Sequence, residues 1–246
     1  MGKYPSVQTL LGDPTVIFTV LVILTPLLFC RSVGAVVSYL FTPMMVASWV
    51  YLGVVLYITH GDGKSIALGE RDQRVALWFL MNGVYFNLFL DVVSGQFQMM
   101  DEMSRQYLVV EPRYQFGVFD VHGQSVFMTS MCELFFQSPL CIVAYYAYCR
   151  NKSYKLVAEF TVCVLHAAGV WWFYFPEAIS GFEHLGGWPA SVSEALGFNR
   201  LLFFWFGFWF CGLLWLYVPY QIGKTAWINI CEAVTKSGML ENKKQN

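Results

Sequence analysis

The sequence predicts an all-α fold, an integral membrane helix bundle with about six transmembrane helices. Of its 246 residues, 57% are hydrophobic and only 13% are charged, whereas about a quarter of the residues of a soluble domain are charged. The polar N-terminal segment MGKYPSVQTLLGDP lacks a cleavable signal pattern, so the first hydrophobic stretch is expected to remain as a span. The net charge of −1 argues against nucleic acid as a partner.

Six stretches are long and apolar enough to cross a bilayer, which takes roughly 20 residues. The fourth is the longest, and its first turns, FDVHGQS, are expected at the membrane surface. The chain shows no repeat, low-complexity tract or linker, so we expect one membrane domain over residues 1–246. The expected spans are 14–31, 36–59, 75–98, 119–149, 155–176 and 200–222.

The connections between these spans are polar and set the orientation. With six spans, eleven of the fifteen lysine and arginine residues lie on the side of both termini. Cytosolic loops carry the excess of positive charge, so both termini are expected in the cytosol. The other side holds the four remaining arginines. The eleven are Lys3, Lys64, Arg71, Arg74, Arg150, Lys152, Lys155, Lys224, Lys236, Lys243 and Lys244; the four are Arg31, Arg105, Arg113 and Arg200.

The chain ends in KKQN, which resembles the dilysine signal of endoplasmic reticulum membrane proteins. Such a signal works only on a cytosolic tail, in agreement with the charge distribution. We therefore expect a multi-pass protein of the endoplasmic reticulum membrane. The alternative is a solvated basic tail that only resembles the signal.

Two carboxylates lie within the expected spans. Asp91 follows Asn87 by one helical turn on the third span, and Glu133 precedes Gln137 by one turn on the fourth, so each pair shares a helix face. Counting about 1.5 Å per residue, both carboxylates fall in the middle to luminal half of the membrane. They are therefore expected to share one cavity.

Ionisable side chains inside a membrane are costly and by default mark function. Two carboxylates in a low-dielectric pocket cannot both stay ionised cheaply, so at least one is expected to carry a proton at neutral pH. A neutral carboxylic acid suits general-acid chemistry on an apolar substrate. The alternative is that Asp91 and Glu133 only form interhelical hydrogen bonds.

Other polar residues are less specific. His166 on the fifth span could equally be a bundle histidine with satisfied hydrogen bonds, and Glu159 is expected to snorkel or cap near the cytosolic surface. Asp120 and His122 lie at the luminal entry of the fourth span, and Glu177 lies near the same surface.

Aromatic residues are concentrated in WWFYF (171–175) and LLFFWFGFWFCGLLWLY (201–217). Aromatic faces stabilise cations without offering a nucleophile, so a pocket lined with them suits a carbocation or a flat sterol-like ligand. The alternative, lipid-facing bulk, is expected for most of them, including Trp205 and Trp209. Trp215, just ahead of Pro219 deep in the last span, is expected to line the pocket.

Several chemistries are excluded by their missing motifs. The seven cysteines mostly lie in apolar stretches, with no C-x-x-C pair and no zinc-type His/Cys spacing, so we expect buried thiols and no metal. No Ser/His/Asp pattern, phosphate-binding glycine loop or dinucleotide fingerprint is present, and we expect no cofactor. The chain has no aspartate-rich motif for a diphosphate, so protonation is the expected start of any cation chemistry.

The segment CELFFQSP (132–139) resembles the fourth-span motif of the EXPERA-domain family, which includes emopamil-binding protein, the sterol Δ8–Δ7 isomerase, and the sigma-2 receptor. YKLVAEFTVCVLHAAGVWWFYFPE is similar, without gaps, to the next span of the isomerases, and LLWLYVP carries Trp215 and Pro219 at the family positions. The resemblance covers roughly residues 75–225. It implies a five-helix core around a ligand cavity open to the membrane, in which the stretch 36–59 is an extra helix.

The resemblance also implies roles for four residues. In the sterol isomerases, a histidine and a glutamate one turn apart, a glutamate on the next span and a deep tryptophan carry out the proton transfer. These positions correspond to Asn87, Asp91, Glu133 and Trp215, with a one-residue adjustment of the alignment around Asn87 and Asp91. Asn87 thus replaces the histidine and Asp91 the first glutamate, which puts ordinary sterol isomerisation in doubt.

Two functions remain in view, with a purely structural bundle as a third. The first is a cofactor-independent isomerase or terpenoid cyclase that protonates an alkene or epoxide of a sterol or terpenoid. The second is a non-catalytic amphiphile-binding protein like the sigma-2 receptor. Membrane lipid is an expected partner, and the oligomeric state, a homodimer included, stays open. The expected catalytic residues are Glu133, Asp91, Trp215 and Asn87, and the expected substrate-binding residues are Gln137, His166, Tyr85 and Trp172.

Overall fold

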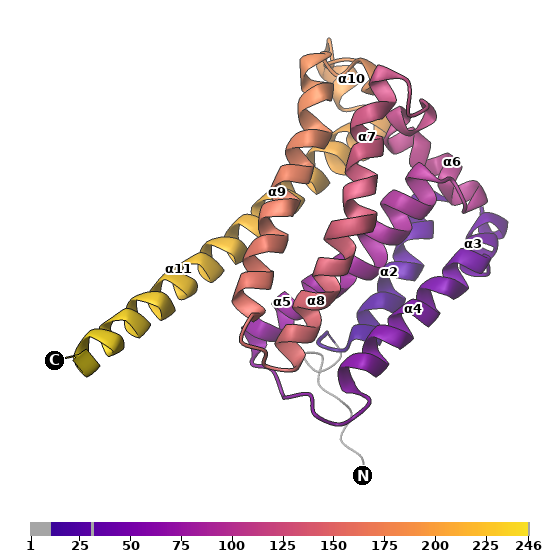
Figure 1. Cartoon of the computed structure of the whole chain (residues 1–246). Coiled ribbons are helices and arrows are strands. Elements are labelled where there is room, and N and C mark those ends of the chain that lie inside the picture. Colours follow the sequence, from indigo (N-terminus) through magenta and orange to yellow (C-terminus); the bar gives the residue numbers. More distant parts are fainter. Residues whose placement is uncertain (1–10, 31, 246) are drawn as a thin grey trace.

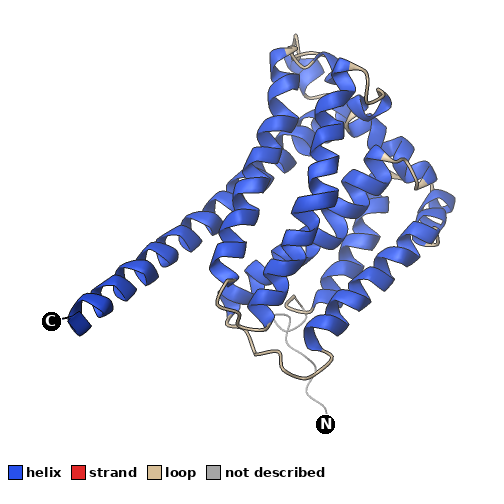
Figure 2. Cartoon of the chain, in the orientation of Figure 1, coloured by secondary structure: helices blue, strands red, loops and turns tan. Residues whose placement is uncertain are grey.

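The computed structural model describes residues 11–30 and 32–245, without the side chains of residue 29 and residues 238–245. Within these residues all regular structure is helical, and no strand occurs (Figure 2). The predicted all-α class is therefore confirmed. Lys3 and Arg31, which the charge count uses, and the side chains of the terminal KKQN lie outside the described part of the chain.

The helices follow one another with short connections (Figure 1). Three of the long rods change from α-helix to π-helix or back without a break. The elements are α2 (Pro14–Phe29), α3 (Val33–Leu40), α4 (Pro43–His60), α5 (Glu70–Met81), η1 (Asn82–Gln96), α6 (Asp101–Val110), η2 (Pro112–Gln115), α7 (Val121–Cys132), η3 (Glu133–Gln137), α8 (Ser138–Cys149), α9 (Lys155–Ile179), η4 (Glu183–Leu185), α10 (Val192–Ala195), η5 (Arg200–Phe210) and α11 (Cys211–Gln245).

Five of these rods are long and apolar enough to cross a membrane, which identifies a multi-pass membrane protein. The first expected span, 14–31, forms an apolar helix of only 16 residues, α2. The five rods are Pro43–His60, Glu70–Gln96, Val121–Cys149, Lys155–Ile179 and Arg200–Ser237.

The predicted start of the second span, 36–59, was wrong, because the helix is interrupted between α3 and α4. Pro43 has no N–H to continue the helix, and the side chain of Thr42 caps the new helix by accepting a hydrogen bond from the backbone of Met45. The spanning rod therefore begins at Pro43 and ends at His60.

Successive rods run in opposite directions (Figure 1). One end of the bundle holds α6, the start of α7 and α10, and is called the α10 end below. The opposite end holds the connections 61–69 and 150–154, and α11 extends past the bundle on that side. This arrangement places the start of α2 and the end of α11 at the same end.

The main core lies between α2, α4, α5, η1, α8 and α9. Tyr85 is buried there, and its hydroxyl lies 2.8 Å from those of Tyr39 and Thr25. A second, smaller aromatic core at the α10 end joins Phe182 to η5. Trp205 and Trp209 pack on this second core, and Trp205 donates its indole hydrogen bond to the carbonyl of Ala195 (3.0 Å). The expectation of lipid-facing bulk is wrong for these two tryptophans.

Close backbone contact joins the rods that carry the candidate site. Gly83 of η1 faces α8, where an added Cβ would lie 2.9 Å from Cβ of Cys141 and 3.0 Å from the carbonyl oxygen of Ser138. Both distances are too short for a side chain. The missing side chain at Gly83 thus lets η1 lie directly against α8.

Candidate active site

Asp91 lies on η1 and accepts a hydrogen bond from the hydroxyl of Tyr107 on α6. The ring of Tyr107 packs beside that of Tyr114, with 5.8 Å between centroids. Both rings lie against Gly95 of η1, where an added Cβ would stand 2.8 Å from Cε1 of Tyr107 and 3.2 Å from Cε2 of Tyr114. The bare backbone at Gly95 therefore makes room for the two tyrosines.

Glu133, the first residue of η3, is the second carboxylate of the candidate site; it is buried, whereas Asp91 is partly buried. Its Oε2 has no hydrogen-bond partner among the described residues. The segments η1 and η3, which carry Asp91 and Glu133, are in contact. The structure thus brings together the two segments that carry the predicted carboxylates.

Tyr107 and Tyr114 share the electrostatic environment of these carboxylates. Burial, together with the nearby charge of Asp91, raises the pKa of Tyr107 well above the ordinary value of a phenol. Burial and the charges of Asp91 and Glu133 do the same to the pKa of Tyr114. Both hydroxyls therefore stay neutral and can donate hydrogen bonds.

Tyr107 and Tyr114 were not predicted from the sequence, because their segment was expected to be a loop between two spans. The segment forms α6 and η2, which fold back onto η1 and α7. Tyr114 also accepts a hydrogen bond of 3.4 Å from the hydroxyl of Ser130 on α7. The apolar run YLVVEPRY, unusual for an exposed connection, was the available signal.

Three further predicted residues carry buried polar groups. Nδ2 of Asn87 and both ring nitrogens of His166 have no hydrogen-bond partner within the described chain. A satisfied bundle histidine is therefore not what the structure shows for His166. Gln137 faces α9, since an added Cβ at Gly169 would lie 3.6 Å from its Oε1. His166 precedes Gly169 by three residues and so lies on that same face of α9.

The helix type affects how the predicted pairs line up. The pairs Asn87/Asp91 and Glu133/Gln137 were assigned to common faces on the assumption of an α-helix. Both pairs lie in π-helical segments, whose i→i+5 hydrogen bonds put between four and five residues in each turn. A spacing of four residues still returns to nearly the same face, so each pair stays together. The five-residue segment η3 is of the single-turn kind that is frequent at functional sites.

Trp215 of α11 packs on the junction of α5 and η1. Its indole N–H donates to Oδ1 of Asn82 at 2.8 Å, and its ring lies 4.9 Å from that of Phe86 and 5.5 Å from that of Trp78. Trp215 is half-buried. These contacts place Trp215 beside the first part of η1. The residues that it contacts there, Asn82 and Phe86, precede Asn87 and Asp91 in the chain.

Tyr85 and Trp172 lie apart from the carboxylates in different ways. The hydroxyl of Tyr85 is directed to α2 and α3, where it contacts Thr25 and Tyr39. Trp172 is 49% exposed on α9. It lines a groove of about 570 Å³ between α7 and α9, a volume within the range of small-molecule sites. The groove is lined by Ser125, Met128, Cys132, Trp171, Trp172, Phe175 and Pro176.

The environment of Glu159 differs from the prediction that its side chain would snorkel or cap near the cytosolic surface. Glu159 is fully buried rather than exposed at the surface, and accepts hydrogen bonds from Arg71 at 2.8 Å and from the hydroxyl of Tyr148. These bonds tie α5, α8 and α9 together at the end opposite α10. Glu159 is thus a paired structural carboxylate, separate from the unpaired Glu133.

Comparison with known proteins matches residues 102–223 to the family described as EXPERA (EXPanded EBP superfamily). Glu133, Gln137, His166, Trp172 and Trp215 lie within this stretch. Asn87 and Asp91 precede it.

A curated relative extends the similarity. The chain is 22% identical over 200 residues to 3-beta-hydroxysteroid-Delta(8),Delta(7)-isomerase of Rattus norvegicus, which covers 81% of this chain and 78% of the rat protein. The predicted resemblance is confirmed. Residues 102–223 of this membrane bundle are therefore similar to the EXPERA family.

Proposed function

We propose that this protein is an isomerase or cyclase of sterol or terpenoid lipids in the endoplasmic reticulum membrane, working by proton transfer without a cofactor. The observation that carries the proposal is the unequal environment of two carboxylates, the partly buried Asp91 and the buried Glu133. Asp91 accepts a hydrogen bond from Tyr107, whereas Oε2 of Glu133 has no partner within the described residues. The name of the rat relative, which specifies a steroid double-bond isomerase, supports this class of reaction.

The pair divides the acid and base roles. A hydrogen bond stabilises a carboxylate in its charged form, so Asp91 is the better base. Glu133 lacks such a donor and is the better acid. An acid and a base held in different environments are what a proton-transfer isomerase requires.

The reaction needs one proton in and one proton out. Glu133 delivers its proton to one alkene carbon, whose π electrons form the new C–H bond, and the neighbouring carbon becomes cationic. Asp91 then removes a proton from the carbon beyond the cation, and that C–H electron pair forms the new double bond. Substrate and product are isomers, and no electrons are exchanged with a third species.

The cation and the returning proton also need support. Trp215, with Phe86 and Trp78 around it, provides aromatic faces beside η1. The proton taken up by Asp91 has to return to Glu133 before the next turnover. The hydroxyls of Tyr107, Tyr114 and Ser130 surround this path.

The groove between α7 and α9 is the proposed entry for an apolar substrate. Its lining is aromatic and aliphatic, and it includes Cys132, the residue directly before Glu133. Trp172 contributes to this lining, which matches a substrate-binding role at the entrance. With an epoxide as substrate, the same acid would open the ring and the resulting cation would close a new one.

The test is expression in a yeast that lacks its own sterol isomerase, followed by mass spectrometry of the extracted lipids. Restored ergosterol would identify Δ8–Δ7 isomerisation, and a new terpenoid from a supplied precursor would identify cyclisation. In heavy water the product should gain deuterium at the protonated carbon. Glu133→Gln should abolish turnover at equal expression, while Glu70→Gln, the same change on a side chain that is 77% exposed, should not. Wild-type turnover by Glu133→Gln would refute the mechanism.

A second candidate function is binding of cationic amphiphiles without turnover. It is favoured by Asn87, which stands where the resemblance implies a histidine of the isomerases. In this case the two carboxylates would pair with an ammonium group. Saturable amphiphile binding that Glu133→Gln weakens, with no deuterium uptake into any supplied sterol or polyprene, would favour this function over the enzyme.

A further inference from the structure

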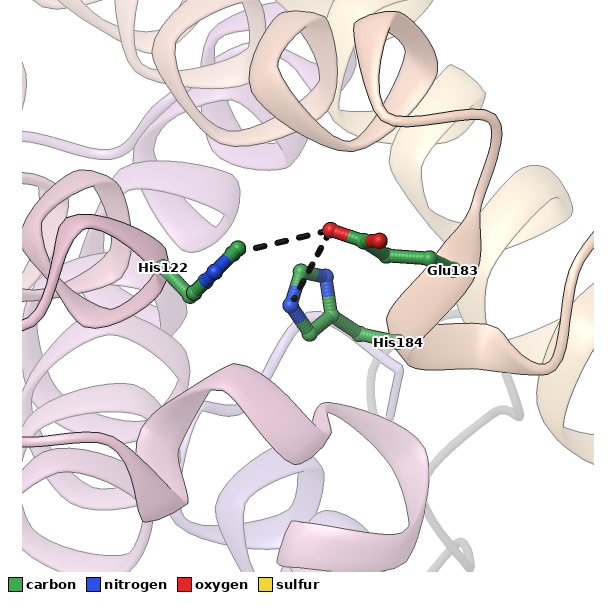
Figure 3. Close-up of side chains that lie close together, drawn as sticks. All are labelled: His122, Glu183 and His184. Carbon is green, nitrogen blue, oxygen red and sulfur yellow. Dashed lines mark ion pairs between the residues drawn. The ribbon is translucent and has the colours of Figure 1, made fainter.

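Two histidines and a glutamate meet at the α10 end of the bundle, away from the carboxylate pair (Figure 3). His122 lies in the first turn of α7, and Glu183 and His184 lie in η4, after α9. Their side chains point toward one another across the gap between the two segments (Figure 3). They are the group of three potential metal ligands that the described residues contain.

The distances fit a small metal ion. Nδ1 of His122 lies 3.6 Å from Oε1 of Glu183, and Nε2 of His184 lies 3.7 Å from the same oxygen. Zinc binds such atoms at about 2.0–2.2 Å, so two ligands of a tetrahedral ion lie about 3.3–3.6 Å apart. All three ligand atoms already fall within 4.8 Å of one another. The remaining adjustment falls to the side chains of His122 and Glu183, which are 42% and 52% exposed.

A buried carboxylate supports His184 from behind. Nδ1 of His184 donates a hydrogen bond of 2.8 Å to Oε2 of Glu177, and the backbone N–H of His184 donates one of 3.1 Å to Oε1. The Nδ1 proton thereby leaves the lone pair on Nε2, which is directed to Glu183. Metal-binding histidines are commonly held in this way by a carboxylate on the second ring nitrogen.

The backbone of η4 is also fixed in position. Phe182, directly before Glu183, has φ of 63°, a left-handed conformation that is uncommon for phenylalanine. Its side chain is held in the aromatic core with Phe204 and Phe208. This anchoring sets the direction in which Glu183 and His184 leave the turn.

We propose that His122, Glu183 and His184 bind one divalent transition-metal ion, zinc in the first place, with a fourth position open to water. A His₂Glu set with one open position is an established zinc arrangement. His122 precedes Glu133 by eleven residues, which is about 16 Å along the helix. The ion therefore joins the connection after α9 to the start of α7 and lies outside the proton-transfer site.

Such an ion stabilises the folded bundle. It binds a site that exists only when α7 and η4 are in place, so binding raises the free energy of unfolding with metal concentration. This effect is measurable without any knowledge of the substrate. It is also independent of whether the protein is an enzyme.

The test uses the full-length protein purified in detergent without a histidine tag and stripped with a chelator. Zn²⁺ is titrated against a chromophoric chelator, and Co²⁺ is added separately to read the ligand geometry from its visible absorption. We expect one ion per chain and a higher melting temperature with Zn²⁺. His122→Gln and Glu183→Gln should each weaken binding at least tenfold and remove the thermal shift.

The matched control is His60→Gln, which removes a histidine at the opposite end of the bundle, where it contacts Tyr145. It should bind Zn²⁺ like the wild type. The substituted side chains of His122 and Glu183 are both exposed, so their loss should leave the metal-free melting temperature unchanged. Absence of zinc binding, equal binding in all variants, or an equal loss in His60→Gln would each overturn the proposal.

Discussion

The hydroxyl of Tyr107 distinguishes the two carboxylates of the candidate site, Asp91 and Glu133. It binds Asp91 and leaves Glu133 without a donor at Oε2 in the described structure. Tyr107 touches a reacting group in the proposed mechanism without itself exchanging a proton with the substrate. Its role is to keep Asp91 charged and oriented.

Tyr107→Phe should therefore lower turnover while the protein stays folded. A hydrogen bond to a charged group contributes about 1.5–3 kcal/mol, and loss of that amount from the transition state slows a reaction roughly 10- to 100-fold. The phenylalanine keeps the ring against Gly95. The measurement is initial rate in yeast microsomes at matched expression. Tyr57→Phe, on a side chain 76% exposed, is the control; equal rates for both variants would contradict the role of Tyr107.

Arg113 is expected to stabilise the folded protein and not to take part in the proposed reaction. It is 1% exposed and lies 2.7 Å from Glu111 and 3.6 Å from Glu177. Burial alone would lower the pKa of Arg113, but the hydrogen bond and charge of Glu111 and the charge of Glu177 raise it above its ordinary value. Arg113 also donates to the carbonyl of Phe173 on α9 at 2.8 Å. One guanidinium thus offsets part of the negative charge of Glu111 and of Glu177, the carboxylate that holds His184.

Arg113→Met should destabilise the protein by about 3–5 kcal/mol, because it leaves buried carboxylates without their partner. The measurement is thermal unfolding in detergent. Arg105→Met removes an arginine whose side chain is 73% exposed, and it should change the free energy of unfolding by less than about 0.5 kcal/mol. Similar melting temperatures for the two variants would show that the ion pairs of Arg113 contribute little to the stability of the folded protein.

The residues that sequence alone identified are those whose chemistry conflicts with a membrane. Asp91 and Glu133 stand out because a carboxylate in an apolar run needs a reason. Tyr107 bonds directly to Asp91, but a tyrosine between two spans is ordinary, and the run YLVVEPRY marked its segment without marking the residue. His122 and His184 are 62 positions apart in the chain, and only the folded connection after α9 brings them together.

At the scale of elements, the close packing of η1 on α8 keeps the two carboxylate-bearing rods together. This contact depends on Gly83, whose place no larger residue can take without moving α8. Hydropathy located both rods. It could not show which glycine lies at a contact and which faces open space.

Gly83→Ala should destabilise the bundle by about 1–3 kcal/mol through overpacking and should also lower turnover. Gly53→Ala on α4 is the matched control, since nothing lies within 4 Å of its added Cβ. In a helix this control change should be neutral or stabilising by up to about 1 kcal/mol. Thermal unfolding and the microsomal rate measure both effects. If Gly83→Ala left both the melting temperature and the rate unchanged, η1 and α8 would have to move apart at no cost in stability, which would contradict the role of Gly83.

At the scale of the whole molecule, alternating rods place the start of α2 and the end of α11 at one end of the bundle (Figure 1). The charge distribution predicts that this end is cytosolic and that the α10 end faces the lumen. Composition was enough to predict a membrane bundle. The helix break before Pro43 and the short length of α2 depend on local capping and on proline geometry. An average of hydropathy over about 20 residues does not detect these local features.

Ser191→Asn should become glycosylated if the α10 end is luminal, because it creates the acceptor sequence Asn-Val-Ser. Asparagine also replaces serine well as the cap of α10. The native Asn151-Lys152-Ser153 provides an internal control at the opposite end, which should stay unmodified. The measurement is a mobility shift removed by a glycosidase. Modification at Asn151 instead would reverse the orientation.

The π-helical stretch η1 bears on how this chain and its relatives diverged. One inserted residue turns an α-turn into a π-turn, and the flanking helix can keep its register with its neighbours. The alignment with the sterol isomerases needs a shift of one position around Asn87 and Asp91, which lie inside η1. A single insertion or deletion there re-aims the side chain beside the carboxylate and spares the rest of the bundle. We therefore expect that the gain or loss of one codon in η1 can change which side chain lies beside Asp91, and gap placement in this span deserves as much weight as residue identity when relatives are compared.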